Sequence, residues 1–251
     1  MLRLIFALGI TCLAMSPASA HFQELIPSTD IVPDQGDHSV GLSLVFTHPV
    51  EGGPTMDMGQ PVAFGVLADG KKIDLRGALS PKQVDGKKAF EARYKLPKPN
   101  DYVFYLAPAP YWEPAEKHFL VHHTKVVVDF GAGESWDALV GAPMEIQPLT
   151  RPYGLWTSNL FRGIVLKDGK PLPNARIEVE WINDTSIKIP ADAFATQVVK
   201  ADQNGVFAYA IPRAGWWGFN AITEGKISGP DGKSADAEIG GTIWIKAVDL
   251  K

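Results

Sequence analysis

Cysteine is nearly absent from this chain, whose 251 residues include only Cys12. Cys12 lies in an N-terminal segment that has the pattern of a secretory signal peptide, so we expect the mature chain to contain no thiol. This excludes a thiolate metal site and leaves nitrogen, oxygen and thioether sulfur as possible ligands. A lipoprotein anchor at Cys12 is less favoured, because the residues around it do not form a lipobox.

The chain also lacks a hydrophobic run long enough to cross a membrane. Arg3 supplies a positive start, residues 4–15 are mostly apolar, and small residues follow at Ala18 and Ala20. The apolar stretch is shorter than the roughly 18 residues that a spanning helix needs. We therefore expect residues 1–20 to be a signal peptide that is cleaved after export, and the mature protein to be periplasmic.

Basic residues are outnumbered by acidic ones. The 24 Lys and Arg and the 28 Asp and Glu give a formal net charge of −4, which becomes −5 when Arg3 is removed with the signal peptide. No basic stripe is present that would bind nucleic acid or an anionic lipid surface. Nucleic acid is therefore excluded as an expected partner.

Long helical periodicity is missing as well, and short β-rich segments separated by turn residues take its place. Strands are expected in the first half at 40–46, 61–66, 101–106 and 119–129, and in the second half at 161–166, 175–181, 196–201, 206–211 and 215–221. The 20 Pro and 24 Gly fit the many turns that such a chain needs. The pattern predicts an all-β protein built from sandwich domains.

Two prolines and a glycine within residues 148–154 indicate a domain boundary. We expect an N-terminal β-sandwich domain over residues 21–150, which would hold the metal site, and a C-terminal β-sandwich over residues 151–251. The second half has a strand, a DGKPLPNA turn, a strand and an ADQNGVF hairpin in that order. It resembles transthyretin-like or carboxypeptidase-regulatory-like sandwiches. Its last hairpin is expected to pair residues 217–223 with 241–248.

His21 is the most informative residue, because cleavage after Ala20 would make it the first residue of the mature chain. Its free amine and its imidazole would then close a chelate ring on one metal ion. Neutral imidazole suits nickel, copper or zinc far better than calcium or magnesium. We therefore expect a transition-metal site at the mature N-terminus.

His48 begins a loop that carries two methionines, within the segment FTHPVEGGPTMDM. In extended backbone Met56 and Met58 project to the same side, so their thioethers either converge on one ion or pack one apolar pocket. Packing is the more common role of a loop methionine. Ligation by Met56 and Met58 is the alternative.

A second group of histidines lies in the expected strand KHFLVHHTK, where alternation puts His118 and His122 on one face and His123 on the other. His118 and His122 are about 13 Å apart along a strand and cannot share one ion. We choose His122 as the ligand, because it lies deeper in the apolar run. For His118 a solvated position and for His123 an ordinary structural role are expected.

No catalytic motif accompanies these residues. The chain has no G-x-S-x-G, no H-E-x-x-H and no glycine-rich phosphate loop before a helix. The aromatic pairs Tyr111-Trp112 and Trp216-Trp217 are more typical of packing than of a sugar-binding platform. We therefore do not expect an enzyme.

Three segments carry a family resemblance that covers nearly the whole mature chain. They are FTHPVEGGPTMDMGQPVAFGV, DYVFYLAPAPYWEPAEKHFLVHHTKVVVD and PLTRPYGLWTSNLFRGIVLKDGKPLPNARIEVEW. They resemble the periplasmic nickel-uptake proteins, called NikK- or NikM-like, that accompany energy-coupling-factor nickel or cobalt transporters. The residues matching that family's motifs are His21, His48, Glu51, Met56, Met58, Phe119, His122, Thr124 and Lys125. At His123 the chain departs from the family pattern, in which a tyrosine is common.

The resemblance implies an extracytoplasmic nickel-binding protein whose partners are the membrane components of a nickel or cobalt uptake transporter. Our hypothesis from the residues agrees in kind: the amine and imidazole of His21, with His48 and His122, form a nitrogen-rich site completed by Met56, Met58 or water. Ni(II) is the expected ion, with copper or cobalt as alternatives. Binding is expected to weaken below about pH 6, because the ligands must lose protons.

Three other functions remain open. The first is a periplasmic copper chaperone that uses the same histidines with Met56 and Met58. The second is a histidine-brace copper protein, for which an N-terminal histidine and one further histidine are the minimum. The third is a structural sandwich module that binds no metal tightly. Calorimetric metal titration and tests for copper-dependent turnover separate them.

Overall fold

The computed structural model describes residues 20–131, 133–229 and 232–250. The predicted signal peptide therefore lies outside the described residues, except for Ala20. The strands are β1 Phe22–Pro27, β2 Ser39–Thr47, β3 Ala63–Ala68, β4 Lys71–Asp74, β5 Ser80–Val84, β6 Lys87–Lys95, β7 Asn100–Ala107, β8 Tyr111–Glu113, β9 His118–Phe130, β10 Met144–Pro148, β11 Leu155–Trp156, β12 Leu160–Lys167, β13 Lys170–Pro171, β14 Arg176–Trp181, β15 Gln197–Lys200, β16 Val206–Ala210, β17 Gly215–Ser228 and β18 Ser234–Val248. Two short 3-10 helices, Arg76–Ala78 and Asp192–Phe194, interrupt them. In this described part, no helix is long and apolar enough to span a membrane.

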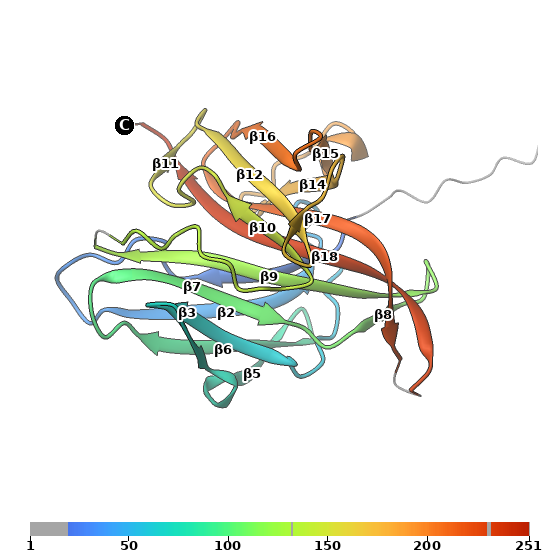
Figure 1. The fold of residues 1–251 in the computed structure, drawn as a ribbon, viewed down its shortest axis with the longest axis horizontal. Coiled ribbons are helices and arrows are strands. Elements are labelled where there is room, and N and C mark those ends of the chain that lie inside the picture. Colours follow the sequence, from blue (N-terminus) through green and yellow to red (C-terminus); the bar gives the residue numbers. More distant parts are fainter. Residues whose placement is uncertain (1–19, 132, 230–231, 251) are drawn as a thin grey trace, which may run out of the picture.

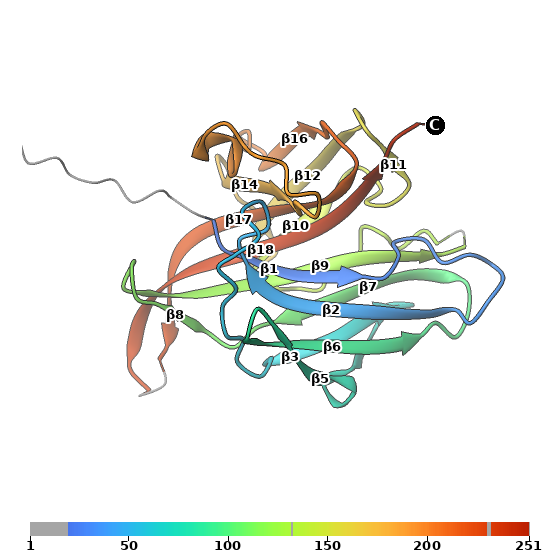
Figure 2. The same ribbon diagram turned by 180° about the vertical axis from the view of Figure 1, so that it is seen from behind.

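The strands form one large sheet and two small ones. The large sheet has the order β15-β14-β17-β18-β9-β7-β3-β4, with β8 added beside β9 and β11 beside β18. The first small sheet has the order β1-β2-β6-β5, and the second consists of β10, β12, β13 and β16. Figures 1 and 2 show the long β17–β18 hairpin crossing the molecule between the layers that contain the two small sheets.

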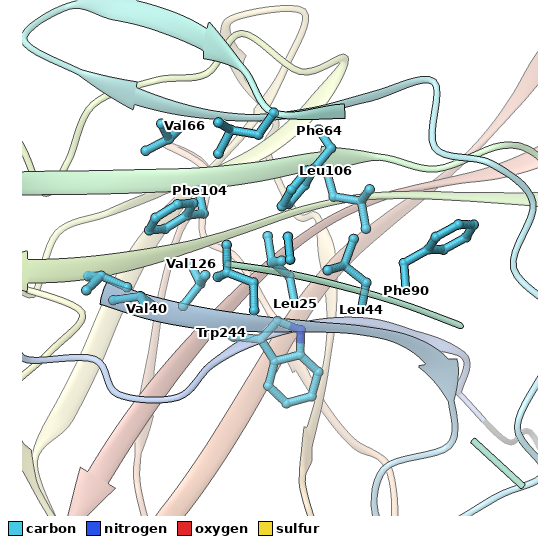
Figure 3. Close-up of a cluster of buried hydrophobic side chains, with 14 of the residues drawn as sticks. Leu25, Val40, Leu44, Phe64, Val66, Phe90, Phe104, Leu106, Val126 and Trp244 are labelled. Atoms are coloured by element: carbon cyan, nitrogen blue, oxygen red, sulfur yellow. The ribbon is translucent and has the colours of Figure 1, made fainter. Parts of the chain in front are cut away.

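The first core lies between the first small sheet and the β9-β7-β3 part of the large sheet. Strand β2 alternates over residues 40–44: Val40, Leu42 and Leu44 are buried in this core, whereas Gly41 and Ser43 are partly exposed. Figure 3 shows Leu25 and Leu44 of the small sheet near Phe64, Phe104, Leu106 and Val126 of the large one. Burial of these large side chains supplies the main driving force for the sandwich.

The second core lies between the second small sheet and the β14-β17-β18 part of the large sheet. Its members include Phe161, Val165, Ile177 and Phe219, which are all fully buried. Strand β18 faces both cores: Trp244 belongs to the first, whereas its neighbours Ile243 and Ile245 belong to the second. Alternation along this one strand therefore joins the two sandwiches.

The all-β, sandwich-like fold expected from the sequence is confirmed. The expected last hairpin is present, with Trp217 paired to Ile245 and Ala221 to Gly241, and it extends much further toward residues 228 and 234. The boundary near residue 150 remains a prediction, because the large sheet crosses it through the parallel pairing of β9 with β18. Strand β10, from the first predicted domain, contributes Met144 to the second core. The likeness of the second half to transthyretin-like domains also remains a prediction.

Candidate metal centre

His21 and His48 are brought together by the register of two neighbouring strands. Phe22 of β1 pairs with Thr47 of antiparallel β2, so the residue before Phe22 and the residue after Thr47 lie at the same end of the pair. The two imidazole rings accordingly have their centroids 4.5 Å apart, in an edge-to-face arrangement. Two of the three predicted histidines are therefore neighbours.

Glu113, at the end of β8, completes this group from the large sheet. Its Oε2 lies 3.1 Å from His21 Nε2, and both side chains are nearly buried, with 12% and 11% exposure. Burial and the nearby His48 lower the pKa of His21 to about 4, although Glu113 opposes the shift. Burial also lowers the pKa of His48, against the opposing charges of Glu51 and Glu113. Both imidazoles are thus neutral at pH 7, which is the form that binds metals.

His122 lies on the core-facing side of β9, as the alternation predicted, and is almost fully buried. Its Nε2 is 2.9 Å from Glu238 Oε1 on β18, and its Nδ1 is 3.3 Å from Asn220 Nδ2 on β17. Thr242 donates a hydrogen bond to Asn220 Oδ1 at 3.0 Å, which turns the amide N–H toward His122. His122 Nδ1 therefore accepts a hydrogen bond and Nε2 donates one to Glu238.

The ring of Phe46 neighbours both His21 and His122. Its centroid is 5.9 Å from that of His21 and 6.0 Å from that of His122. Among the described residues, no three His, Asp or Glu side chains already surround one point as metal ligands. The arrangement consists of a pair, His21 and His48, with Glu113 bonded to His21, and of His122, which neighbours Phe46 and lowers the pKa of His21 by its charge.

Met56 and Met58 are both buried in the first core. The Met56 amide donates to the Phe46 carbonyl at 2.8 Å, which holds the loop against β2. Met58 Sδ accepts a hydrogen bond from Gln23 at 3.7 Å and shares the lining of a small cavity with His122. Packing is therefore observed for both methionines, and their ligation of a metal remains a prediction.

The two other histidines of β9 lie apart from this group. His118 Nε2 is 3.0 Å from Glu116 Oε2. His123 projects to the opposite face of the large sheet, where it lines a different cavity. Neither belongs to the cluster around His21.

A cavity of about 370 Å³ adjoins His21 on the side of the preceding residue, Ala20. Its other lining residues are mainly acidic: Glu116, Glu178, Glu224 and Glu238, with Arg176, Ile222 and Thr223. Burial acts to raise the pKa of Glu238, but the hydrogen bond from His122 and the nearby His118 and His21 lower it overall. Glu238 therefore carries a negative charge at pH 7, whereas burial raises the pKa of Glu116 and Glu178.

Sequence reasoning missed the carboxylates of this region. Glu113 and Glu238 belong to strands β8 and β18, which are more than 100 residues apart in the chain. No spacing motif connects them to His21 or His122. The resemblance did point to Glu51, whose Oε2 lies 3.7 Å from His48 Nδ1.

Comparison with known proteins identifies the family of the chain. No curated protein matches it. Similar solved structures include dimeric latent PorU from Porphyromonas gingivalis, with 11% identity over 96% of this chain and 21% of that one and a TM-score of 0.25. A second is the Ca²⁺-stabilized adhesin with which an Antarctic bacterium binds ice, with 11% identity over 86% of this chain and 45% of that one and a TM-score of 0.22. A third is the adhesin InvE of Yersinia pseudotuberculosis, with 12% identity over 87% of this chain and 58% of that one and a TM-score of 0.24.

The chain spans less than two thirds of the length of each of these three proteins. Their low TM-scores give no basis for transferring a function. A family model described as a domain of unknown function, DUF4198, matches residues 18–225, which is well over half of the chain. The protein therefore belongs to the DUF4198 family.

Proposed function

We propose that this protein binds a transition-metal ion outside the cytoplasm, in the periplasm, and delivers it to the membrane components of a nickel or cobalt uptake transporter. Ni(II) is the proposed ion, and copper or cobalt are the alternatives. The observation that carries the proposal is the contact between His21 and His48, whose rings are 4.5 Å apart, with Glu113 at 3.1 Å from His21. The transport role rests on the family resemblance described above.

The donor set suits a divalent ion. Metal–nitrogen and metal–oxygen bonds are about 2.0–2.2 Å long, so two ligands at adjacent corners of a square or an octahedron lie about 3 Å apart. The separation of His21 Nε2 from Glu113 Oε2 has this value, which allows an ion to replace the proton between them. Chelation by the α-amine that cleavage would create at His21 uses Nδ1 of the same ring instead, and Glu113 would then orient the imidazole through Nε2.

The cavity beside His21 supports the proposed metal site, because Ala20 and His21 both line it. An α-amine at His21 would therefore open toward Glu238 and its neighbours. The negative charge of Glu238 raises the local concentration of cations near the amine. The mature N-terminus would thus be reached from solvent through a path that favours a positively charged ion.

The test is calorimetric titration of the chain that begins at His21 with Ni(II), Co(II), Cu(II) and Zn(II). One nickel ion is expected to bind per chain. A matched chain with one extra residue before His21 is expected to bind nickel at least tenfold more weakly, because the amine becomes an amide. Equal binding by both chains would show that the amine is not a ligand. Absence of binding would indicate a structural module that binds no metal tightly.

The structure changes the expected pH dependence of binding. With the pKa of the His21 imidazole lowered to about 4 by burial, this ring stays neutral well below pH 6. The α-amine, which titrates near pH 8 in free peptides, then becomes the main group that must lose a proton. We expect nickel affinity to fall about tenfold per pH unit between pH 7 and 5. Calorimetry at several pH values measures the slope, and a flat profile would exclude the amine as a ligand.

One observation favours the copper alternative. Met58 and His122 line the same small cavity, and a thioether with an imidazole suits Cu(I). A copper chaperone would hold Cu(I) against a competing chelator and lose this ability when Met58 is replaced by leucine. The His21–His48 pair also has the composition of a histidine brace, which would produce peroxide or cleave polysaccharide when loaded with copper.

A further inference from the structure

A second cavity, of about 200 Å³, lies on the opposite face of the large sheet from His122. Its floor comes from β3, β7 and β9, and residues 140–145 form one wall. Most of its lining is apolar and includes Ala63, Ala107 and Val140. None of the predicted metal ligands lines it.

A buried ion pair lines this apolar cavity. Lys125 Nζ lies 2.6 Å from Glu145 Oε1, and the two side chains are 4% and 5% exposed. Such a pair costs desolvation free energy, and apolar side chains of similar size would fill the same space at no such cost. Because the pair lines the cavity, an occupant of the cavity would contact its charged groups.

The hydrogen bonds of the pair are unequally satisfied. The carboxylate of Glu145 accepts from Lys125 and also from the backbone amides of Val140, Gly141 and Ala142, at 2.8, 2.8 and 3.3 Å. The ammonium of Lys125 has three N–H groups, but among the described residues only Glu145 accepts from it. A buried ammonium needs further acceptors, and the adjoining cavity is where they would lie.

His123 adds a second nitrogen base to the same lining. It lies two residues before Lys125 on β9, so both side chains project to one face of the sheet. Its Nδ1 is buried and has no hydrogen-bond partner among the described residues. Lys72 lies at the rim, 5.7 Å from the centre of the Tyr105 ring. Lys72 thus adds a second ammonium group at the mouth of the cavity, and the charge of Asp137 acts on Lys125 besides that of Glu145.

We propose that this cavity is a binding site for a small aliphatic monocarboxylate. The carboxylate oxygens accept hydrogen bonds from Lys125 and His123, and the aliphatic chain packs against Ala63, Ala107 and Val140. The remaining N–H groups of Lys125 favour an anion over a neutral molecule, and the apolar lining favours an aliphatic body over a sugar or a phosphate. This site lies on the opposite face of the sheet from the metal centre, and the proposal does not rest on the metal-binding function.

The test uses hexanoate as the probe and hexan-1-ol as its uncharged match, titrated into the full mature chain while the His123 ring signals are followed by NMR. Saturable hexanoate binding that shifts these signals is expected, with hexan-1-ol at least tenfold weaker. Ala142→Leu, which fills the cavity and keeps the ion pair, is expected to weaken hexanoate binding at least tenfold. Lys125→Met is expected to do the same.

Lys82→Met serves as the control, because Lys82 lies on β5, outside this cavity. It is expected to leave hexanoate binding unchanged. Lys125→Met leaves the buried carboxylate of Glu145 without its ion-pair partner, which endangers folding. If this variant does not fold, the result for Ala142→Leu tests the proposal. Absence of saturable binding, which would mean that only water fills the cavity, overturns the proposal. Equal binding of hexan-1-ol or unchanged binding by Ala142→Leu overturns it too.

Discussion

Glu113 shows how a single carboxylate defines what the histidines around it can do. It is bonded to His21 and acts on His48 by its charge, yet it comes from a strand of only three residues. A glutamate in this position gives the cluster a hard oxygen donor besides its nitrogens. Oxygen donors suit Ni(II), Co(II) and Zn(II) better than they suit Cu(I).

Replacing Glu113 by glutamine is therefore expected to weaken Ni(II) binding at least tenfold and to leave Cu(I) binding within about threefold. The amide keeps the size of the side chain and removes the charge that would neutralise the ion. Calorimetric nickel titration and a chelator competition for Cu(I) measure the two affinities. Glu91→Gln, at an exposed position of β6, is the control, and equal nickel affinity of the Glu113 variant and the native chain would remove Glu113 from the ligand set.

Glu180 is expected to make the stability of the fold depend on pH. Burial raises its pKa from 4.5 to about 8, although Thr196 and the Val50 amide donate hydrogen bonds to it. Between pH 4.5 and 8 the folded chain keeps a proton that the unfolded chain has lost, so the free energy of unfolding falls as the pH rises through this window. The stabilisation is complete below pH 4.5 and is lost above about pH 8.

Glu180→Gln is expected to flatten this dependence, because an amide does not titrate. The difference in unfolding free energy between pH 5 and 8 should shrink by at least about 1.4 kcal/mol, the equivalent of one pKa unit. Urea denaturation of the chain beginning at His21, without metal, measures it. The exposed Glu134→Gln is the control, and an unchanged slope in the Glu180 variant would mean that this carboxyl is already ionised at pH 5.

The site residues were predictable only where they carry a local signal. His21 follows a cleavage pattern, and His48 lies in a recognisable loop, so both could be chosen from the sequence. Glu113, Glu238 and Asn220 have no local signal, because they reach the histidines only through strand pairing. Met56 and Met58 could not be assigned, since a buried thioether has the same pattern whether it packs or binds.

At the scale of elements, the register of β1 with β2 decides whether a site exists. Because the side-chain period of a strand is two, a shift by one residue would turn His21 to the opposite face and separate it from His48. Strand β1 was not expected from the sequence, whereas β2 was, because residues 40–46 alternate in part and are mostly apolar. A short strand of mixed residues, FQELIP, gives too little pattern to be recognised.

Strands β18 and β10 approach each other closely at Gly241. A Cβ on Gly241 would lie 2.6 Å from the carbonyl carbon and oxygen of Met144 and 2.7 Å from the Glu145 amide. These are backbone atoms that cannot move without shifting β10 away from the large sheet. Gly241 therefore allows the second small sheet to pack beside β9.

Gly241→Ala is expected to lower the free energy of unfolding by about 1–3 kcal/mol, the usual cost of overpacking. Urea denaturation measures the loss. Gly77→Ala is the matched control, because a Cβ there meets no atom within 4 Å. A Gly241 variant as stable as the native chain would mean that β10 moves freely over β18.

At the scale of the whole molecule, two hydrophobic cores share one sheet. The all-β class and most strands follow from alternation and turn residues; the turn at Asp202, for example, forms with its side chain accepting from the Asn204 and Val206 amides. The parallel pairing of β9 with β18 was not predictable, because parallel neighbours are separated by a long crossover and have no turn signal. Single-sequence reasoning therefore yields the strands and misses how the halves join.

The shared sheet predicts cooperative unfolding. Calorimetry of the chain from His21 is expected to give one endotherm, with a calorimetric enthalpy close to the van't Hoff enthalpy, because breaking the β9–β18 pairing exposes both cores. Residues 151–251 alone are expected not to fold, since they lack β10 and β9. Two resolved endotherms, or a stable isolated second half, would show that the boundary near residue 150 separates independent units.

Alternation along β9 places two adjacent histidines on opposite faces of the large sheet. His122 and His123 are joined by one peptide unit, yet one faces the cluster of histidines and glutamates and the other faces the cavity beside Lys125. A ligand that shifts β9 when it binds on one face changes the binding free energy of a ligand on the other face. By thermodynamic linkage the influence is reciprocal, so metal affinity and carboxylate affinity would change by the same factor.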